Sequence, residues 1–310
     1  MHKRLLWLAT LVTTASLSLA AAPVKAKPNQ KFALLMSHMD NEFTIELSGA
    51  VQKKAAELSA KLTSFDARND IARQIGQLET VVTQGYTGIM IEPVAVDGVG
   101  PAIQAAKKAG LAVITIDQKI TQQELADAYV GANPVQGGEM EMETAAKAIK
   151  GKGNIAFLLG PLGSDAELGR KKGYENIIKA KYPNIKVVYQ QTANWRTDQA
   201  LTLVENWLQT GTPLAAIVAN NDDMALGAVK AVKDAQMLGK IQIFGLDATP
   251  NGLAAVKEGS MAATLSQSTA DQGYMAMDTC VKAANGIKVA AEVYVPHTLI
   301  TKANVDKFIK

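Results

Sequence analysis

Polar side chains that could contact a ligand follow apolar, strand-like runs at several places in this 310-residue chain. In open α/β sheets, ligands bind at the carboxyl ends of the strands, where loops from several strands converge. The residues at these places are rich in carboxylates and amides: Ser37 to Asn41, Asp117 with Gln118, Asn220 to Asp223, Asp247, and Gln267. These positions are the candidates for a binding site.

Such a set of side chains suits a neutral ligand that carries many hydroxyl groups. A sugar hydroxyl donates and accepts hydrogen bonds, and carboxylates accept them, guanidinium groups donate them and amides do both. An aromatic ring can lie against the apolar face of a pyranose or cyclitol, where burial contributes about 25 cal/mol per Å². Tight binding then follows without any chemical reaction.

Alternating apolar runs and amphipathic segments from residue 31 onward predict parallel sheets that helices cover on both faces. In the first half we expect strands at 32–37, 62–66, 88–92, 112–117 and 129–131, and helices at 43–58, 71–84 and 100–109. In the second half we expect strands at 155–160, 186–190, 215–220, 242–247 and 262–267, and helices near 167–181, 197–209, 224–235 and 270–285. The pattern predicts two similar α/β units with a short join near residues 130–134.

Other protein classes lack their sequence signatures here. A content of 48% apolar and 20% charged residues is typical of a globular chain. The few histidines have no metal-site spacing, no glycine-rich nucleotide loop occurs, and residues 160–164 lack the spacing of a serine nucleophile elbow. Basic residues are dispersed among acids, unlike a nucleic-acid-binding surface. We expect a protein that is not an enzyme, with no metal, no cofactor and no nucleic-acid partner; an exported α/β enzyme remains the alternative.

Residues 1–26 have the features of a cleavable secretory signal peptide. A short basic start precedes the apolar stretch Leu5 to Ala22, and the small residues Val24 and Ala26 stand three and one positions before the expected cut. Removing this segment takes three cations and no acid, so the net charge of +3 falls to zero (3 − 3). An uncleaved signal anchor is the alternative, and Pro23 favours cleavage.

The single cysteine, Cys280, lies far from the signal segment. The chain therefore has no lipid-attachment cysteine after the signal and no intramolecular disulfide. Cys280 falls in an apolar helical stretch and is interpreted as core packing. We expect an exported, unlipidated protein of the bacterial periplasm.

Six segments resemble, in order, successive motifs of the periplasmic sugar-binding proteins of the ribose, allose, galactofuranose and inositol type. They cover essentially the whole mature chain and are FALLMSHMDNEF (32–43), VITIDQ (113–118), RKKGY (170–174), ANNDDMALG (219–227), FGLDATP (244–250) and ATLSQ (263–267). Residues 191–202 and 299–304 are most similar to inositol-type members. Any one motif is weak, and six in register are specific.

The resemblance implies the periplasmic binding protein type I fold, in which two doubly wound lobes are joined by three hinge crossings. After a signal peptide at 1–26, residues 27–132 plus 268–295 would form the N-terminal lobe and residues 133–267 plus 296–310 the C-terminal lobe. It also implies a monomer that binds a monosaccharide or cyclitol between the lobes and delivers it to the membrane subunits of an ABC permease.

The resemblance also implies which residues touch the ligand. From the first lobe, Asn41 supplies a hydrogen bond and Phe43 a stacking face, with Ser37 nearby, and Asp117 accepts from ligand hydroxyls. Gln267 lies at a hinge crossing.

From the second lobe, the resemblance implies that Arg170 reaches into the cleft and that Trp195 stacks on the opposite ligand face. Asn221 would bond hydroxyls and Asp247 would accept from them. Together with the first-lobe residues, these side chains would enclose the ligand.

Two positions depart from the ribose pattern. Thr44 stands where a second aromatic is usual, which trades a stacking wall for space and a hydroxyl. Gln118 stands where an arginine is usual, which replaces a bidentate cation with a neutral amide that also accepts. A larger hexose, a sugar alcohol or a cyclitol such as myo-inositol is therefore favoured over ribose.

Ordinary structural roles compete with each of these assignments. Asn41 and Asp222 each precede a helical run and could cap a helix, which we favour for Asp222. Asp117 and Asp247 follow apolar runs and could form turns. The remaining alternatives are core packing for Phe43, surface packing for Trp195, solvation for Arg170, and an ordinary loop position for His38.

Two other functions share this architecture. A sugar-responsive repressor would need an amino-terminal helix-turn-helix, and the signal segment occupies that place. A sensor that presents the ligand to a chemoreceptor or kinase is the alternative to transport, and neighbouring genes for an ATPase and a permease would favour transport.

Overall fold

The computed structural model of this chain describes residues 24–309. The predicted signal peptide lies outside the described residues except for 24–26. In that short stretch the Ala26 amide donates to the Leu58 carbonyl at 3.0 Å, and Val24 packs against the core of the first lobe. No helix in the described part of the chain is long and apolar enough to cross a bilayer.

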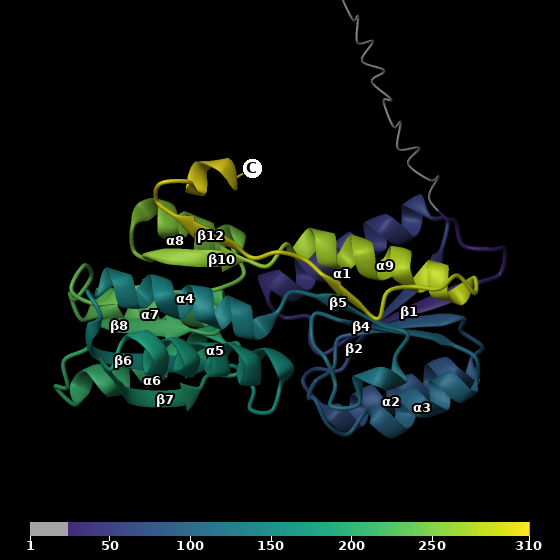
Figure 1. Cartoon of the computed structure of the whole chain (residues 1–310), viewed down its shortest axis with the longest axis horizontal. Helices are drawn as coiled ribbons and strands as arrows, with labels where there is room; N and C mark the ends of the chain where they lie inside the picture. Colours follow the sequence, from purple (N-terminus) through teal and green to yellow (C-terminus); the bar gives the residue numbers. More distant parts are fainter. Residues whose placement is uncertain (1–23, 310) are drawn as a thin grey trace, which may run out of the picture.

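The described chain forms two lobes that lie end to end along the longest axis of the molecule (Figure 1). The first contains a six-stranded sheet in the order β11-β5-β4-β3-β1-β2. Its strands are β1 (Lys31–Met36), β2 (Lys61–Asp66), β3 (Gly88–Ile91), β4 (Ala112–Ile116), β5 (Ala128–Gly131) and β11 (Glu292–Tyr294). Its helices are α1 (Glu42–Glu57), α2 (Ile71–Thr83), α3 (Gly100–Lys108), η1 (Gln123–Leu125) and α9 (Thr269–Ala284).

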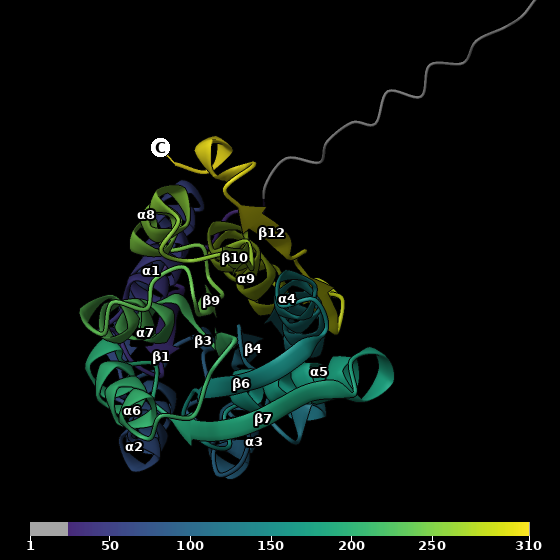
Figure 2. The same cartoon turned by 90° about the vertical axis from the view of Figure 1, so that its left-hand side faces the viewer.

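The second lobe contains a six-stranded sheet in the order β12-β10-β9-β8-β6-β7. Its strands are β6 (Lys152–Leu159), β7 (Asn184–Thr192), β8 (Ala216–Ala219), β9 (Gln242–Phe244), β10 (Ala263–Ser266) and β12 (Thr298–Thr301). Its helices are α4 (Pro134–Ala148), α5 (Asp165–Lys181), α6 (Thr197–Gln209), α7 (Asp222–Asp234), α8 (Pro250–Glu258) and η2 (Val305–Lys307). In the end-on view, α6, α7 and α8 lie on one side of this sheet and α4 and α5 on the other (Figure 2).

Burial on both faces explains the continuous apolar runs of the central strands. Every residue of β1 from Phe32 to Met36 is fully buried. Phe32, Leu34 and Met36 pack under α1 and α9, while Ala33 and Leu35 pack under α2 and α3 on the opposite face. Alternating side chains therefore join two separate cores through one strand.

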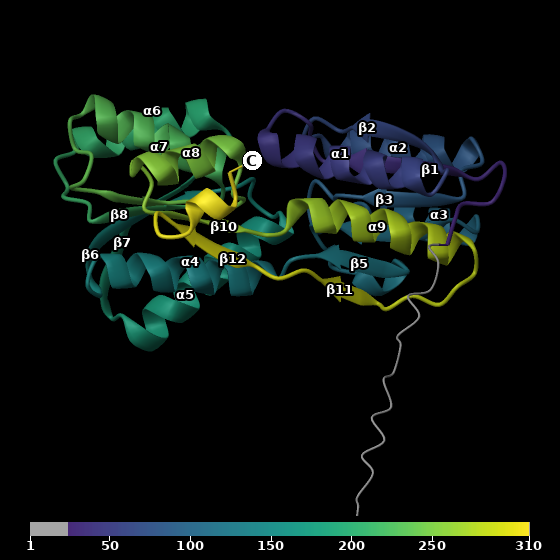
Figure 3. The ribbon, with the colours of Figure 1, turned by 90° about the horizontal axis from the view of Figure 1, so that it is seen from above.

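The chain crosses between the lobes three times. It passes from β5 to α4 near residues 132–133, from β10 to α9 near 267–268, and from β11 to β12 near 295–297. The last of these segments is seen from above in Figure 3, running from the first lobe to the second. This architecture confirms the predicted two-lobed, doubly wound fold.

Two α-helices and two strands, namely α4, α8, β11 and β12, are absent from the sequence-based prediction, as are the short helices η1 and η2. Helix α4 contains the pair Gly137 and Gly138, and α8 contains Asn251 and Gly252, which are residues typical of turns. The two strands are only three and four residues long. Strand β12 also pairs with β10 in the antiparallel sense, so the second sheet is not wholly parallel as expected.

Close packing of α4 against α5 accounts for the glycine inside α4. A Cβ atom on Gly138 would lie 2.2 Å from the backbone oxygen of Arg170, and one on Gly173 would lie 2.4 Å from the backbone oxygen of Val135. Backbone atoms cannot move aside to make room for an added methyl group, whereas the end of a flexible side chain can. The two helices thus fix where the backbone of Arg170 lies.

We expect Gly138→Ala to lower the free energy of unfolding by about 1–3 kcal/mol, because the added methyl group overpacks this helix contact. Gly76→Ala in α2 is the matched control, since no atom lies within 4 Å of the added Cβ. That change should be neutral or stabilising by up to about 1 kcal/mol. Urea denaturation of both variants measures the difference, and equal stabilities would contradict the packing argument.

Candidate functional site

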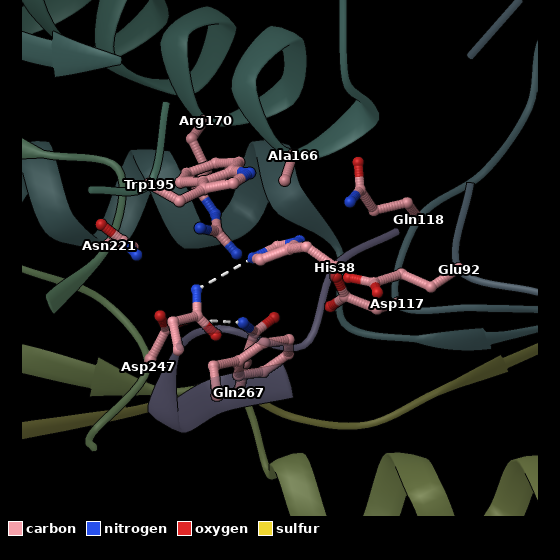
Figure 4. A pocket seen from close by; sticks show the side chains of 12 residues that line it. His38, Glu92, Asp117, Gln118, Ala166, Arg170, Trp195, Asn221, Asp247 and Gln267 are labelled. Carbon is pink, nitrogen blue, oxygen red and sulfur yellow. Dashed lines mark hydrogen bonds between the residues drawn. The ribbon is translucent and has the colours of Figure 1, made fainter. Parts of the chain in front are cut away.

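A cavity lies between the lobes, at the carboxyl ends of their central strands. Side chains from both lobes line it (Figure 4). The lining residues are His38, Asn41, Phe43, Glu92, Asp117, Gln118, Ala166, Arg170, Trp195, Asn221, Asp247 and Gln267.

The structure brings together nine of the eleven residues predicted for the site: Asn41, Phe43, Asp117, Gln118, Arg170, Trp195, Asn221, Asp247 and Gln267. Ser37 and Thr44 do not line the cavity and are buried behind it. Glu92 and Ala166 also line the cavity, although neither was predicted, and so does His38, for which an ordinary loop position was expected. Glu92 follows the apolar run of β3 directly, which is the same signal that identified Asp117.

A chain of hydrogen bonds at the start of α1 fixes the first-lobe side of the cavity. Asn41 caps this helix, and its Oδ1 accepts from the Thr44 amide and hydroxyl, both at 2.9 Å. Its Nδ2 therefore faces His38 Nε2, at 3.1 Å. His38 Nδ1 lies 2.8 Å from the Ser37 hydroxyl. Asn41 is thus both a helix cap and a cavity residue.

This arrangement makes His38 a neutral imidazole. The Asn41 amide N–H can only donate, so His38 Nε2 accepts and the proton sits on Nδ1. Burial also lowers the pKa of His38, although Asp40 and Asp66 oppose this shift. The Thr44 hydroxyl donates to the backbone and side-chain oxygens of Asn41 and does not reach the cavity. The expectation that Thr44 offers its hydroxyl to a ligand was therefore wrong.

Two carboxylates, Glu92 and Asp117, lie next to each other on the first-lobe side (Figure 4). Glu92 Oε2 accepts from the Ser37 amide at 3.1 Å. Burial and the neighbouring Asp117 raise the pKa of Glu92 to about 8. Burial raises the pKa of Asp117 to about 6, and Arg170 across the cavity opposes this shift.

Arg170 extends from α5 into the cavity and is only 4% exposed. One guanidinium nitrogen donates to the Asn220 carbonyl, while Nε has no protein partner. The guanidinium lies 5.7 Å from the centre of the Trp195 ring. The alternatives of a solvated arginine and a surface tryptophan are therefore wrong.

Three cavity residues have left-handed or strained backbone angles. The φ angles are 62° for Asp117, 63° for Trp195 and 136° for Asp247. Non-glycine residues persist in such conformations where surrounding structure holds them, and they cluster at ligand sites. Asp247 Oδ1 accepts from Gln267 Nε2 at 2.8 Å, which ties the end of β9 to a crossing segment.

The helix cap of α7 is Asn221, whose Oδ1 accepts from the Met224 amide at 3.0 Å. The expectation that Asp222 caps this helix was wrong. Asp222 is fully buried and accepts instead from the Thr249 amide at 2.9 Å and the Thr264 hydroxyl at 2.7 Å. It thereby joins α7, α8 and β10 behind the cavity.

Contacts between the lobes surround this cavity. The Val96 amide donates to the Gly163 carbonyl at 3.1 Å, and the Lys119 amide donates to Asp165 Oδ2 at 3.0 Å. Glu42 of α1 also accepts from the side chain of Asn251 in α8. The lobes are therefore closed over the site.

Comparisons with known proteins agree with this geometry. Residues 32–288 match the family model of the periplasmic binding protein domain. The xylitol-binding protein of Mycolicibacterium smegmatis is 37% identical over 274 residues, which cover 87% of this chain and 77% of that protein. The ribose import binding protein of Haemophilus influenzae is 33% identical over 293 residues, covering 94% of this chain and 99% of that protein. A Bacillus halodurans ABC transporter solute-binding protein, solved with bound myo-inositol, superposes with a TM-score of 0.87 at 33% identity, covering 90% and 97% of the two chains.

We expect the ligand-free protein to lose stability as the pH rises from about 4.5 to about 8. The folded-state pKa of Glu92 is raised to about 8 from 4.5, so in this range the folded state binds more protons than the unfolded state. Glu92→Gln should reduce the slope of the unfolding free energy against pH by up to about 1.4 kcal/mol per pH unit, which is the effect of one proton. Urea denaturation at pH 5, 6, 7 and 8 tests this, and identical slopes for both proteins would contradict it.

Proposed function

This chain belongs to the periplasmic binding protein family, and from that premise we propose that it binds one monosaccharide or cyclitol between its lobes and delivers it to the permease of an ABC importer. Members of this family that it matches are binding proteins of transporters, so the chain is a binding protein and not an enzyme. We further propose a periplasmic location and a monomeric state.

The observation that carries the proposal is the cavity between the lobes, which presents donors and acceptors from both. Arg170 and Asn221 donate from the second lobe, Asp117 accepts from the first, and Asp247 accepts from the second. A ring with many hydroxyl groups can bond to all of them at once. Nearly complete enclosure leaves each ligand hydroxyl dependent on such a partner, which gives selectivity.

Closure of the two lobes is the proposed mechanism. A ligand favours the closed state only as far as it binds that state more tightly than the open one. Asp117 and Arg170 belong to different lobes, so a ligand contacts both only when the lobes close. The three crossing segments are the proposed hinge, and the bonds of Val96 to Gly163 and Lys119 to Asp165 would break on opening.

We propose myo-inositol or a hexose as the ligand class in preference to ribose. The similar proteins named above bind xylitol, ribose and myo-inositol, so relatedness alone leaves the choice open. Gln118 lines the cavity as a neutral amide, which can donate to one ligand hydroxyl and accept from another. This favours a ring with more hydroxyl groups than a pentose carries.

A thermal denaturation panel tests this function directly. The mature protein, refolded to remove any carried-over ligand, is measured with pentoses, hexoses, sugar alcohols and inositols. A ligand at 100 times its dissociation constant adds about 2.7 kcal/mol of stability, which shifts the midpoint by several degrees. Stabilisation by one or a few polyols is expected. A folded protein that responds to none of them would contradict the proposed function.

Asp247→Asn should weaken binding of the cognate polyol by roughly 10- to 150-fold, because hydrogen bonds to charged groups contribute about 1.5–3 kcal/mol. Arg170→Ala should abolish binding, since it removes the guanidinium from the cavity. Asp271→Asn is the matched control, because Asp271 is exposed on α9. Isothermal titration calorimetry measures the affinities. Wild-type affinity in either cavity variant would show that the site assignment is wrong.

A further inference from the structure

A network of buried polar groups lies in the second lobe, behind the part of the cavity wall that Arg170 forms. It consists of Glu141 on α4, Tyr174 on α5 and Asn220 directly after β8, and all three are 0% exposed. None of them lines the cavity. Burying such groups costs free energy, which hydrogen bonds within the protein must offset.

The direction of each hydrogen bond in this network is fixed. The Gly160 amide donates to Asn220 Oδ1 at 3.1 Å, so the other end of the same side chain, Nδ2, donates to the Tyr174 hydroxyl at 3.1 Å. The tyrosine oxygen is thereby an acceptor, and its own proton goes to Glu141 Oε2 at 2.5 Å. A continuous chain of donors therefore runs from the backbone of Gly160 to the carboxyl group of Glu141.

The same asparagine holds Arg170. One guanidinium nitrogen of Arg170 donates to the backbone carbonyl of Asn220, while the side chain extends into the cavity (Figure 4). Arg170 and Tyr174 are four residues apart on α5 and therefore lie on one face of that helix. The arginine charge also opposes the rise in the pKa of both Tyr174 and Glu141, which places it close to the network. Arg170 and Tyr174 thus bind the same residue, one at its backbone and one at its side chain.

Helix α4 contacts α5 at two points beside this network. Gly138 lies against the backbone of Arg170, and Glu141, three residues later on the same face of α4, reaches the Tyr174 hydroxyl. The first contact fixes the backbone of Arg170, and the second bears on its side chain through Tyr174 and Asn220. All of these residues belong to the second lobe, so the contacts do not depend on closure of the lobes.

We propose that Tyr174 and Glu141 are positioning residues for ligand binding, which act through Asn220 to hold the guanidinium of Arg170 in place at the cavity wall. The inference rests on the proposed function, because it concerns the arginine that donates to the polyol in that cavity. A side chain that is held in place before the ligand arrives loses less conformational entropy on binding, so affinity rises without a further contact. Loss of the tyrosine hydroxyl would free the Asn220 side chain and allow Arg170 other rotamers.

Tyr174→Phe tests the proposal, because it removes the hydroxyl and keeps the buried ring. The probe is whichever of myo-inositol, D-glucose, D-glucitol and D-ribose binds the wild-type protein most tightly. We expect Tyr174→Phe to weaken binding of this probe by about 2- to 10-fold, which is the usual range for one hydrogen bond. Isothermal titration calorimetry on folded, ligand-stripped protein measures the affinity, which a loss of fold stability alone would leave unchanged.

Tyr182→Phe is the matched control. Tyr182 follows the last turn of α5 and donates to Glu143 Oε1 of α4 at 3.0 Å, so it makes the same kind of bond between the same two helices. This bond lies at the end of α5 that is remote from Arg170. The control variant should bind the probe as the wild type does.

The glutamate offers one conservative and one disruptive variant. Burial raises the pKa of Glu141 to about 8, so at pH 7 this group carries a proton in most molecules. Glu141→Gln is also neutral and keeps an oxygen that accepts from the Tyr174 hydroxyl, so we expect an affinity within about twofold of wild type. Glu141→Leu leaves that hydroxyl buried without an acceptor, and we expect a loss of affinity at least as large as in Tyr174→Phe.

A nuclear magnetic resonance measurement observes the arginine without any ligand. The Nε–H signal of Arg170, identified by its absence in Arg170→Lys, reports the surroundings of the guanidinium in the ligand-free protein. We expect Tyr174→Phe and Glu141→Leu to shift or broaden this signal. Tyr182→Phe and Glu141→Gln should leave it where it is in the wild type.

The outcomes separate this inference from the proposed function. If Tyr174→Phe binds the probe as tightly as the wild type, or if its Arg170 signal is unchanged, the inference is overturned and the polyol-binding function stands. An equal loss of affinity in Tyr182→Phe would also overturn it, because the effect would then come from the contact between α4 and α5 in general. If none of the probes binds to folded wild-type protein, the proposed function fails, and the Arg170 signal alone then decides whether Tyr174 and Glu141 position the arginine.

Discussion

Charge compensation inside the closed cavity is the constraint on which the site depends. Asp117 on one lobe and Arg170 on the other are nearly fully buried when the lobes meet, and each needs a partner once water leaves. In an open protein, water serves both groups, so opening carries no such cost. A ligand that bonds to both lobes replaces that water, and closure without it leaves Arg170 Nε and other polar atoms unsatisfied. The same buried charges thus recognise the ligand and couple its presence to closure.

Rigid surroundings make this compensation selective. The backbone of Arg170 is held by the contact with Gly138, and Asn41 and Asn221 are held as helix caps. Asp247 has a backbone conformation that unconstrained residues avoid. Side chains held in this way cannot rearrange around a ligand of different shape, so a hydroxyl in the wrong place leaves one of them unpaired.

The sequence predicts most of the fold because burial dictates the pattern. A strand buried on both faces, such as β1, appears in the sequence as a continuous apolar stretch. An amphipathic helix is recognised by apolar residues that recur three and four positions apart. Helix α4 was missed because Gly137 and Gly138 weaken its pattern, and the reason for Gly138 is a contact with Arg170, which lies 32 residues away in the chain. In the run of four polar residues that includes Asn221 and Asp222, spacing cannot tell the cap from the buried network residue. The backbone angles that orient the cavity side chains also leave no local trace.

In the candidate site, too, some residues could be predicted from the sequence and others could be recognised only in the structure. Most of its residues could be found from motifs, yet Glu92 was assigned to a strand end, where a single charged residue resembles an edge position. Its meaning depends on which groups lie opposite, and only the assembled cavity shows that Asp117 is beside it and that His38 is held neutral. Gln118 has the same property, because an amide in place of a guanidinium changes the charge of the whole cavity. Two side chains that the motifs do not interpret, Glu92 and Gln118, therefore help to determine which hydrogen bonds the first-lobe side of the cavity can offer to a ligand.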